Sequence, residues 1–373
     1  MNKMKVGIVG CGVISGIYLK NCQSFDLLEV AAIADIDLAR AKARAEEYGV
    51  PNACTVDELL ADPDLEMVIN LTIPAVHAEV SIAALEAGKH VYSEKPLAVS
   101  QEDGKRILEA ARKKGLRVGV APDTVLGGGI QTCRKLIDDG WIGTPVAATA
   151  FMMSAGPERW HPNPEFLFDV GGGPMFDMGP YYLSSLITLL GPISRVTGSA
   201  AISFPERTIT SEARYGQKIP VRTPTHVAGV LDFAGGAVAT IITSFDIKGG
   251  SALPRIEIYG SHGTLSVPDP NTFGGPVRIR LAGKDAEWME MPLTHGFTDN
   301  SRGIGLLDMA YGIRLGYPHR ASGDIGYQVL EAMHGFHIAS SEGRHYVMQG
   351  SCDRPAAMPV NLDATKADLF YKE

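Results

Sequence analysis

Cysteine is scarce in this chain of 373 residues, and the few that occur do not indicate a disulfide framework. The five cysteines are scattered, odd in number and form no C-x-x-C pair. A reduced, cytoplasmic protein is therefore the simplest interpretation.

Long apolar runs and an excess of positive charge are also missing. No stretch of about 18 consecutive apolar residues occurs, so we expect no membrane-spanning helix. The net charge of −8 argues against an extended nucleic-acid surface. Lys3 and Lys5 precede an apolar stretch, as in a signal peptide, but glycines break that stretch and we interpret it as a first strand. The length and ordinary composition fit two globular domains.

The first third of the chain alternates short apolar runs with helical patterns. This order predicts an α/β domain with a doubly wound parallel sheet, Rossmann-like, and helices on both faces. The expected strands are 6–9, 30–34, 67–71, 90–93 and 118–121, and the expected helices include 38–48, 76–87 and 103–114.

After Asp123 the rhythm changes to longer β-rich runs, which predict a second α/β domain with a large, mostly antiparallel open sheet. We place the domains at 1–124 and 125–373. The strands carry apolar residues on both alternating faces, so we expect self-association. A polar, turn-rich segment, 204–224, is expected to be a long loop or arm. The expected strands are 146–153, 196–201, 227–233, 238–245 and 255–259.

The first strand and the segment after it have the pattern of a dinucleotide-binding unit. Gly10 permits a tight strand-to-helix turn, and Gly12 permits close approach of a pyrophosphate to the helix N-terminus. The third small position is Ser15 or Gly16, so the strict G-x-G-x-x-G form is not met. Asp35 ends the next apolar run, where an acid binds ribose hydroxyls and repels a 2′-phosphate, which favours NAD over NADP. A glycine turn that binds no ligand is the alternative.

Glu94-Lys95-Pro96 follows the expected strand 90–93 directly. Ligands of doubly wound sheets bind beyond the carboxyl ends of the strands, so we expect Lys95 near the glycine turn. Pro96 fixes its own φ and favours an extended Lys95, which aims the side chain. For an isolated tripeptide of this kind, a surface salt bridge is the alternative.

A second motif, GGGPMFDMGPYY, occupies residues 171–182. Because proline is tolerated in the first turn of a helix, Pro180 predicts a helix that starts near Asp177. Asp177 and Tyr181 then share one helix face. An acid and a phenol on one face suit a polyhydroxylated substrate and supply one proton donor or acceptor. Alternatively, Asp177 is only the helix N-cap and Tyr181 a core aromatic.

Together these segments resemble the glucose–fructose oxidoreductase and inositol dehydrogenase family, Gfo/Idh/MocA. The resemblance spans nearly the whole chain and is most specific from residue 77 to residue 96. It implies a Rossmann-like domain, an α/β domain that packs in dimers or tetramers, and NAD as cofactor. The implied reaction is hydride transfer between the nicotinamide and a hydroxyl of a sugar, polyol or related carbohydrate. The segments that carry it are GIVGCGVISG, IPAVHAEVSIAALEAGKHVYSEKPLA, GGGPMFDMGPYYL and SRGIGLLDMAYGIRLG.

The resemblance also implies roles for single residues. Lys95 matches the lysine that contacts the reacting hydroxyl, and Asp177 matches the acid of the second motif. Tyr181 stands where many members have histidine; it is our first choice as acid/base, with Lys95 as a rival. An adjacent ammonium and a positive nicotinamide would lower the phenol pKa. The expected cofactor contacts are Gly10, Cys11, Gly12, Val13, Ile14, Asp35, Thr72, His77, Glu94, Lys95, Asp123 and Thr124.

Further substrate contacts are expected from loops. Trp160, His161 and Asn163 lie just before the GGG motif, where Trp160 could stack on a sugar face and the other two could bond hydroxyls; a structural tryptophan with capping polar groups is the alternative. His295 and Arg302 flank another turn-rich loop and are weaker candidates.

The sequence also offers a metal site and two other family functions as alternatives. Glu331, His334 and His337 have helical spacing, but no further ligand stands at a recognised spacing, so we predict no metal site. Some relatives cleave glycosides by transient oxidation with tightly held NAD, and others bind dinucleotide without catalysis. The joint presence of the lysine, acid and tyrosine argues against the non-catalytic alternative.

Overall fold

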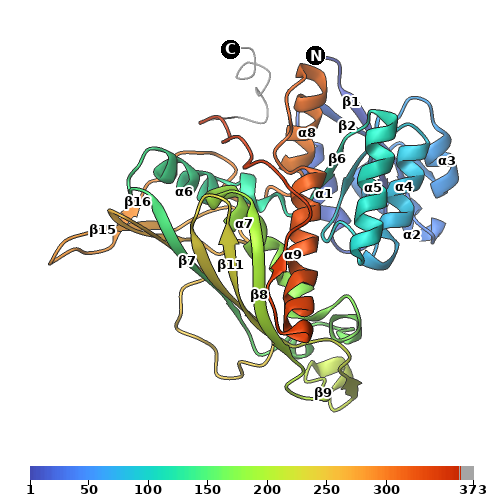
Figure 1. Ribbon diagram of the computed structural model, residues 1–373. Coiled ribbons are helices and arrows are strands. Elements are labelled where there is room, and N and C mark those ends of the chain that lie inside the picture. Colours follow the sequence, from blue (N-terminus) through green and yellow to red (C-terminus); the bar gives the residue numbers. More distant parts are fainter. Residues whose placement is uncertain (361, 363–373) are drawn as a thin grey trace.

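The computed structural model describes residues 1–360 and 362, and its first part is a six-stranded sheet (Figure 1). The strand order is β3-β2-β1-β4-β5-β6, and every pair is parallel. This confirms the predicted doubly wound sheet and sets the carboxyl ends of β1, β2, β4 and β5 along one edge. The strands are β1 Met4–Val9, β2 Leu28–Ala34, β3 Asn52–Cys54, β4 Met67–Asn70, β5 His90–Ser93 and β6 Val118–Val120.

Helices between these strands begin and end at residues with clear capping chemistry. Asp37 accepts hydrogen bonds from two backbone N–H groups at the start of α2, which ends at the left-handed Gly49. Ser100 caps α5 in the same way. Sequence patterns missed β3 and α3 because both are short and lack a long apolar period. The helices are α1 Ser15–Cys22, α2 Leu38–Tyr48, α3 Val56–Ala61, α4 His77–Glu86 and α5 Gln101–Lys114.

The second sheet has nine strands in the order β16-β15-β14-β13-β7-β12-β11-β8-β17. Only the β7–β12 pair is parallel, so the prediction of a large, mostly antiparallel sheet is confirmed. The strands are β7 Pro145–Met153, β8 Ile193–Ala201, β11 His226–Phe233, β12 Val238–Ser244, β13 Ile256–Gly260, β14 Gly263–Val267, β15 Val277–Leu281, β16 Met289–Met291 and β17 Tyr346–Val347.

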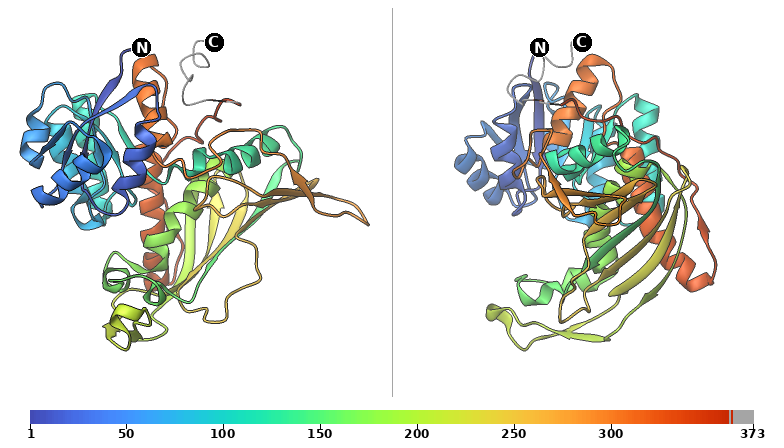
Figure 2. Two further views of the ribbon diagram at one scale, coloured as in Figure 1. Left: turned by 180° about the vertical axis from the view of Figure 1, so that it is seen from behind. Right: turned by 90° about the vertical axis from the view of Figure 1, so that its left-hand side faces the viewer.

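Four helices belong to the later part of the chain: α6 Gly128–Asp138, α7 Gly173–Leu190, α8 Ile304–Leu315 and α9 Gly323–Glu342. α7 packs on β7, β11 and β12, and α9 packs on β8. α8 and α9 also contact β6, and α9 contacts α5, so the C-terminal helices join the two sheets (Figures 1 and 2). The predicted division at residue 124 marks the change of sheet, although 304–342 packs against both parts.

The segment from 204 to 224 is an arm that carries a small antiparallel hairpin, β9 Glu206–Thr208 and β10 Lys218–Pro220. It lies beside the loop that joins β7 to α7, which contains two short 3₁₀ turns, Pro157–Arg159 and Glu165–Phe168. Among the residues that the structure describes, no helix is long and apolar enough to cross a membrane.

Candidate active site

The glycine turn after β1 has the shape that a dinucleotide requires. Gly10 has φ +104°, and a Cβ there would lie 2.7 Å from the Leu71 backbone, so the position needs glycine. A Cβ at Gly12 would meet no atom within 4 Å, which means that this backbone faces open space. The turn therefore leaves room for a phosphate at the start of α1.

Asp35 at the end of β2 holds this turn in place. One carboxylate oxygen accepts a hydrogen bond from the Cys11 N–H at 2.7 Å, and the other accepts from the Asp37 N–H at 2.9 Å. Arg40 approaches the same carboxylate at 3.5 Å. The predicted ribose contact of Asp35 stays a prediction. The Cys11 side chain itself is buried, burial raises its pKa to about 12, and its backbone N–H already binds Asp35, so the predicted cofactor contact of Cys11 stays a prediction.

Exposed apolar side chains lie along the same edge of the sheet. Val13, Ile36 and Ile73 follow β1, β2 and β4, and their exposed fractions are 97%, 100% and 67%. Exposed branched residues at the carboxyl ends of three strands offer apolar surface to flat rings. Ile14 is half-buried and packs on the core. Sequence reasoning named Val13 but missed the two isoleucines, which carry no motif of their own.

Lys95 and Asp177 come together from different sheets. The Nζ atom of Lys95 donates to the Asp177 carboxylate at 2.9 Å and to the Asp177 carbonyl oxygen at 2.5 Å. Burial opposes the ammonium charge, but Asp177, Tyr181 and Glu94 outweigh it and raise the lysine pKa. Lys95 is therefore a fixed cation near neutral pH, and its predicted position is matched by the geometry.

The helix that carries Asp177 starts earlier than predicted. α7 begins at Gly173 with Pro174 in its first turn, and Pro180 lies inside the helix. The prediction that the helix starts near Asp177 is therefore wrong, and so is the alternative that Asp177 is only its N-cap. Close packing along nearly the whole of α7 holds the helix where Pro180 removes one N–H donor. Asp177 and Tyr181 still lie four residues apart on one face.

Tyr181 is buried beside Lys95, whose Nζ lies 5.4 Å from the centre of the ring. Burial raises the phenol pKa, and Lys95 and Arg302 lower it by too little to reverse the shift. The expectation of a lowered pKa is therefore wrong for this state of the protein. Lys95 does lower the phenol pKa, as predicted, but burial disfavours the phenolate and raises the pKa by more.

Arg302 approaches Tyr181 from the loop before α8. Its guanidinium donates to the side-chain oxygens of Asn300 at 2.8 Å and Asn271 at 3.0 Å, and it stacks over Phe273 at 5.8 Å. Both its charge and a hydrogen bond to the phenol act on Tyr181. The predicted position of Arg302 near the site is matched, and its two asparagine partners were missed.

Glu94 connects the lysine to the glycine turn. Its two carboxylate oxygens accept from the Tyr18 hydroxyl at 2.8 Å and from the Lys95 backbone N–H at 3.0 Å. Tyr18 lies on α1, the helix that follows the turn. Sequence analysis missed Tyr18, because nothing near it in the chain distinguishes it from a core aromatic.

Several residues that were predicted to contact the cofactor instead stabilise the loops of the site through hydrogen bonds. His77 is 1% exposed, and its ring nitrogens face the carbonyl oxygens of Pro96 at 2.7 Å and Thr72 at 3.0 Å. Thr72 itself is half-buried and donates its hydroxyl to Asn70 at 2.6 Å. A side-chain contact between His77 and a ligand is therefore excluded, and His77 acts by joining two loops at the edge of the sheet.

Asp123 and Thr124 are also buried. Asp123 accepts from the N–H groups of Gly303 at 2.7 Å and Gly305 at 3.1 Å, so it caps α8. Burial raises its pKa to about 6. The prediction that these two side chains face the nicotinamide is wrong, since each is 1% exposed. His295, predicted to bind substrate, is likewise buried against the Met358 carbonyl oxygen at 3.1 Å.

Trp160, His161 and Asn163 lie together on the loop before α7. The His161 ring meets Trp160 and Phe166 edge-on, with centres 5.4 and 5.3 Å apart. Asn163 accepts from Arg214 of the arm at 3.2 Å. No bond joins these residues to Lys95 among the described contacts, so their predicted role in substrate binding stays a prediction.

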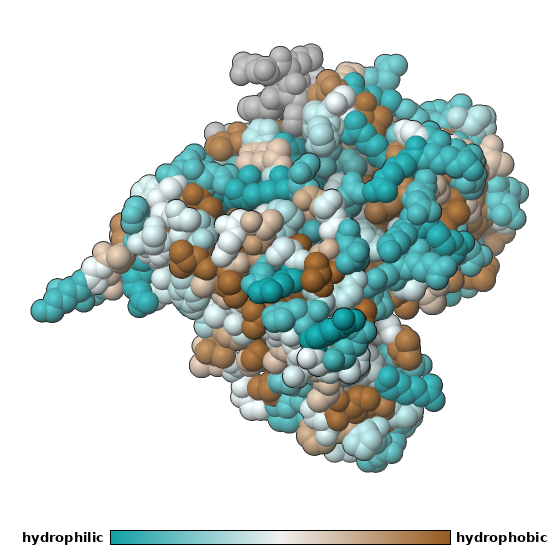
Figure 3. All heavy atoms as spheres, viewed as in Figure 1, coloured by the Kyte–Doolittle hydropathy of each residue, from teal (hydrophilic) through white to brown (hydrophobic). Residues whose placement is uncertain are grey.

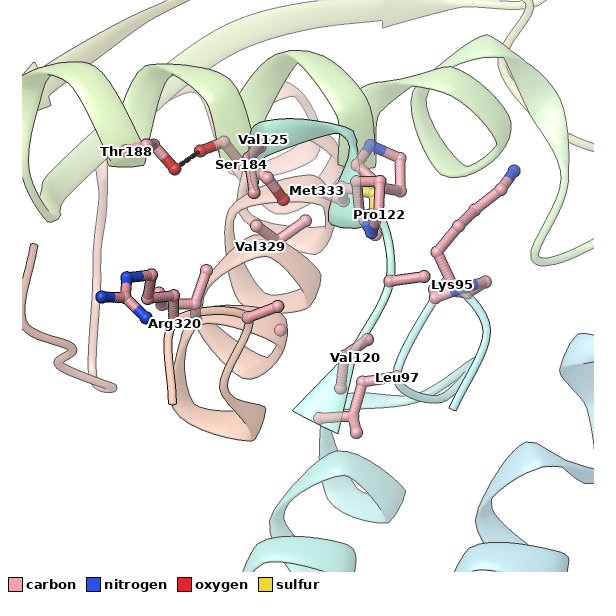
Figure 4. A pocket seen from close by; sticks show the side chains of 16 residues that line it. Lys95, Leu97, Val120, Pro122, Val125, Ser184, Thr188, Arg320, Val329 and Met333 are labelled. Atoms are coloured by element: carbon pink, nitrogen blue, oxygen red, sulfur yellow. Dashed lines mark hydrogen bonds between the residues drawn. The ribbon is translucent and has the colours of Figure 1, made fainter. Parts of the chain in front are cut away.

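A small cavity lies behind Lys95, between β6, α7 and α9 (Figure 4). Its volume is about 20 Å³, enough for about one water molecule. Ser184, Thr188 and Arg320 contribute polar atoms to a mostly apolar lining. In Figure 4 the Lys95 amine points away from this cavity and toward α7, which carries Asp177. The lysine therefore belongs to the candidate active site and not to the cavity.

Comparison with known proteins places the chain in a family. A model described as "Oxidoreductase family, NAD-binding Rossmann fold" matches residues 4–121, and the "GFO/IDH/MocA C-terminal domain" matches residues 130–266. The chain belongs to the Gfo/Idh/MocA oxidoreductase family. Its predicted membership and its cofactor, NAD, are confirmed.

Individual members of the family are similar to this chain at moderate identity. Inositol 2-dehydrogenase of Salmonella typhimurium is 33% identical over 170 residues, which cover 44% of this chain and 51% of the relative. The chain thus spans about half the length of that relative. Levoglucosan dehydrogenase of Pseudarthrobacter phenanthrenivorans is 26% identical over 293 residues, or 71% and 73% of the two chains.

The fold agrees with solved structures. A levoglucosan dehydrogenase in complex with NADH and levoglucosan matches with a TM-score of 0.79 at 21% identity, covering 93% of this chain and 100% of that one. At this identity the match establishes the shared fold.

Proposed function

We propose that this protein is an NAD-dependent oxidoreductase that transfers a hydride between NAD and a hydroxyl-bearing carbon of a sugar, polyol or related carbohydrate. The observation that carries the proposal is the contact of half-buried Lys95 and Asp177 beside buried Tyr181, with Glu94 and Tyr18 connecting Lys95 to the helix after the glycine turn. The names of the similar proteins, an inositol and a levoglucosan dehydrogenase, support the same substrate class.

The residues around the glycine turn fit NAD. When bound, NAD supplies the acceptor or donor of the hydride. Gly12 leaves open space for the pyrophosphate, and the Asp35 carboxylate would accept hydrogen bonds from the adenosine ribose hydroxyls. Val13, Ile36 and Ile73 offer the exposed apolar surface that flat rings need.

Lys95 and Asp177 would bind and orient the reacting alcohol. The Lys95 ammonium is fixed by two hydrogen bonds and keeps its proton, so it donates a hydrogen bond to the substrate oxygen and stabilises negative charge there. Asp177 retains a second carboxylate oxygen that can accept from a neighbouring hydroxyl. These contacts would hold the reacting carbon in one orientation.

Tyr181 would exchange the proton of that hydroxyl. In alcohol oxidation a hydride leaves carbon and a proton leaves oxygen; in carbonyl reduction both return. The raised pKa keeps Tyr181 protonated near neutral pH, ready to donate to a carbonyl oxygen. Oxidation needs the phenolate and is therefore expected to gain speed at alkaline pH. Lys95 is the rival for this role, but its raised pKa keeps the amine protonated near neutral pH, so almost none of it is available as a base.

The test is a panel of aldoses, inositols, uronates and anhydro sugars with NAD, and of the matching ketones with NADH. We expect at least one pair to give saturable cofactor turnover that Lys95→Ala reduces. A protein that binds NADH, as shown by calorimetry, but turns over nothing in the panel in either direction would contradict the proposal.

We further propose that the nine-stranded sheet mediates self-association. Ala228, Ile242 and Phe151 lie side by side across β11, β12 and β7 and are half-exposed. The alternate residues of these strands, such as Ile241, are buried under the helices. In the described part of the chain no helix packs on the half-exposed face, which leaves an apolar surface for a second copy.

A further inference from the structure

Arg302 is half-buried, and in the described part of the chain all of its side-chain hydrogen bonds go to neutral groups. Its guanidinium donates to the amide oxygens of Asn300 at 2.8 Å and Asn271 at 3.0 Å, and to the phenol of Tyr181. A guanidinium carries five N–H donors, so these three contacts do not use all of them. A cation in this setting favours a negatively charged acceptor for the remaining donors.

Hydrogen bonds from the first domain hold the backbone on both sides of Arg302. The Asn21 side chain, near the end of α1, donates to the carbonyl oxygens of Asn300 at 2.9 Å and Arg302 at 2.8 Å. The Asp123 carboxylate accepts from the N–H of Gly303, the next residue, at 2.7 Å. The guanidinium is therefore carried by a fixed backbone, as a binding group requires, and not by a mobile surface loop.

The position of Arg302 is that of a substrate contact and not of a pyrophosphate contact. Asn21 lies about 9 Å along the helix axis from Ser15, the first residue of α1, so its bonds are made far from the glycine turn. The guanidinium reaches Tyr181, and the Lys95 Nζ atom lies 5.4 Å from the centre of the same ring. Arg302 therefore belongs with the residues that are expected to hold the reacting alcohol.

The acidic side chains nearby already have donors of their own. Asp177 accepts from Lys95, Glu94 accepts from a tyrosine hydroxyl and a backbone N–H, and Asp123 accepts from two backbone N–H groups. Asp123 acts on Arg302 through its charge, but no acid in the described residues forms an ion pair with the guanidinium. These negative charges repel a dianionic phosphate more strongly than a monoanionic carboxylate, so the carboxylate is the better match for a single cation.

We propose that the substrate is an acidic sugar, such as a uronate or an aldonate, whose carboxylate is bound by Arg302 while its reacting hydroxyl lies at Lys95. The inference rests on the proposed function for the place of that hydroxyl. Lys95 and Arg302 lie beside the same phenol, so one sugar-sized molecule can reach both. Arg302 is then a specificity-determining residue, because its charge favours a carboxylate over a neutral amide or hydroxymethyl group at the same position.

The first test compares ligands that have nearly the same shape and differ in charge. Glucuronate and glucuronamide, galacturonate and galacturonamide, and gluconate and gluconamide are titrated by calorimetry into protein saturated with NADH, which cannot accept a hydride from an alcohol. We expect the acid of at least one pair to bind about 10- to 100-fold tighter than its amide. Glucose 6-phosphate tests the dianion and should bind more weakly than the best acid.

Three results of this test would overturn the proposal. They are equal binding of acid and amide in every pair, no binding of any acid, and tightest binding of the phosphate. Because no step needs hydride transfer, these results do not depend on the proposed oxidoreductase activity.

The second test asks whether Arg302 supplies the discrimination, measured as the ratio of the dissociation constants of amide and acid. Arg302→Gln should bring this ratio to about 1, because the charge is lost. Arg302→Lys should restore part of it, because the charge returns without the planar guanidinium. If Arg302 only supports Tyr181, both ligands weaken equally in Arg302→Gln and the ratio keeps its wild-type value, which would overturn the proposal.

Arg106→Gln is the matched control, because Arg106 is exposed on α5 and pairs with Asp103 of the same helix. Figure 3 shows mainly hydrophilic residues over α5, so this variant removes the same charge from a solvated surface. Its ratio should stay at the wild-type value. NADH binding, measured for each variant before the sugars are added, separates a loss of folding or of cofactor binding from a loss of carboxylate binding.

Discussion

Lys95 and Asp177 are joined twice, through the carboxylate and through the main-chain carbonyl of the aspartate. The second bond does not depend on the aspartate side chain, so α7 itself fixes the lysine. Lys95 follows a strand of the first sheet and Asp177 lies on a helix that covers the second. The pair therefore closes the site between the two halves of the fold.

Lys95→Ala should lower kcat by about 10²- to 10⁴-fold, because it removes the fixed cation that orients the substrate oxygen. NAD binding, measured by calorimetry, should change little, since the glycine turn is untouched. Lys105→Ala is the control, because Lys105 is exposed on α5 and forms no ion pair in the described contacts. A near-normal kcat in Lys95→Ala would show that Glu94-Lys95-Pro96 is structural.

Tyr181→Phe should lower kcat by about 10²-fold or more while the protein stays folded, because only the hydroxyl is lost. In the wild type, kcat/KM for alcohol oxidation should still be rising at pH 10, since burial raises the phenol pKa above its ordinary value. The variant should lose that rise. Tyr181→His should move the rise toward the imidazole pKa near ~6.5. If Tyr181→Phe keeps both rate and pH profile, the proton passes through Lys95.

Asp35 should set the preference for NAD. The wild type should use NAD with a higher kcat/KM than NADP, and Asp35→Ser should narrow the difference by removing the negative charge near the ribose. Arg40, 3.5 Å from that carboxylate, would then be free to attract a 2′-phosphate. The double variant Asp35→Ser with Arg40→Ala should lose this gain. Equal or better use of NADP by the wild type would defeat the prediction.

Asp123 should make a pH-dependent contribution to stability. Its pKa is raised to about 6 in the folded protein, from 3.8, so the folded state holds the proton more tightly. This contribution is present at low pH and is lost as the pH rises from about 4 to about 6, by at most about 3 kcal/mol. Asp123→Asn should remove it, which urea unfolding of both proteins across that range will show. If the free energy of unfolding changes with pH in the same way in both proteins, the predicted contribution of Asp123 is wrong.

Self-association should depend on the half-exposed sheet face. Light scattering at micromolar concentration should give a dimer or tetramer mass, and Phe151→Glu should shift it toward the monomer by placing a charge in the apolar row. Circular dichroism checks that the variant is folded. A monomer mass for the wild type would exclude the interface.

Motifs with strong local chemistry could be predicted from the sequence. The α2 helix was predicted with its bounds, and Lys95, Asp177, Tyr181 and Arg302 do converge. The place of Lys95 follows from a rule of the fold, since it comes directly after β5 and the carboxyl ends of parallel strands share one edge.

What the sequence could not predict depends on tertiary packing. Asp123 reads as a residue at the edge of the nucleotide site, but its partners, Gly303 and Gly305, lie about 180 positions away in the chain. The sign of the Tyr181 pKa shift depends on burial, which no local pattern reveals. The start of α7 was predicted wrongly from Pro180, because Pro174 and not Pro180 occupies the first turn of the helix.

Transfer of deuterium tests the proposed reaction most directly. The best substrate of the panel, deuterated at the carbon that bears the reacting hydroxyl, is incubated with NAD, and the cofactor is analysed by mass spectrometry. We predict reduced cofactor that carries the deuterium, formed at least about 10²-fold more slowly by Lys95→Ala. Reduced cofactor without deuterium, or deuterium that returns to the sugar while a glycosidic bond is cleaved and no NADH accumulates, would contradict the proposed net hydride transfer.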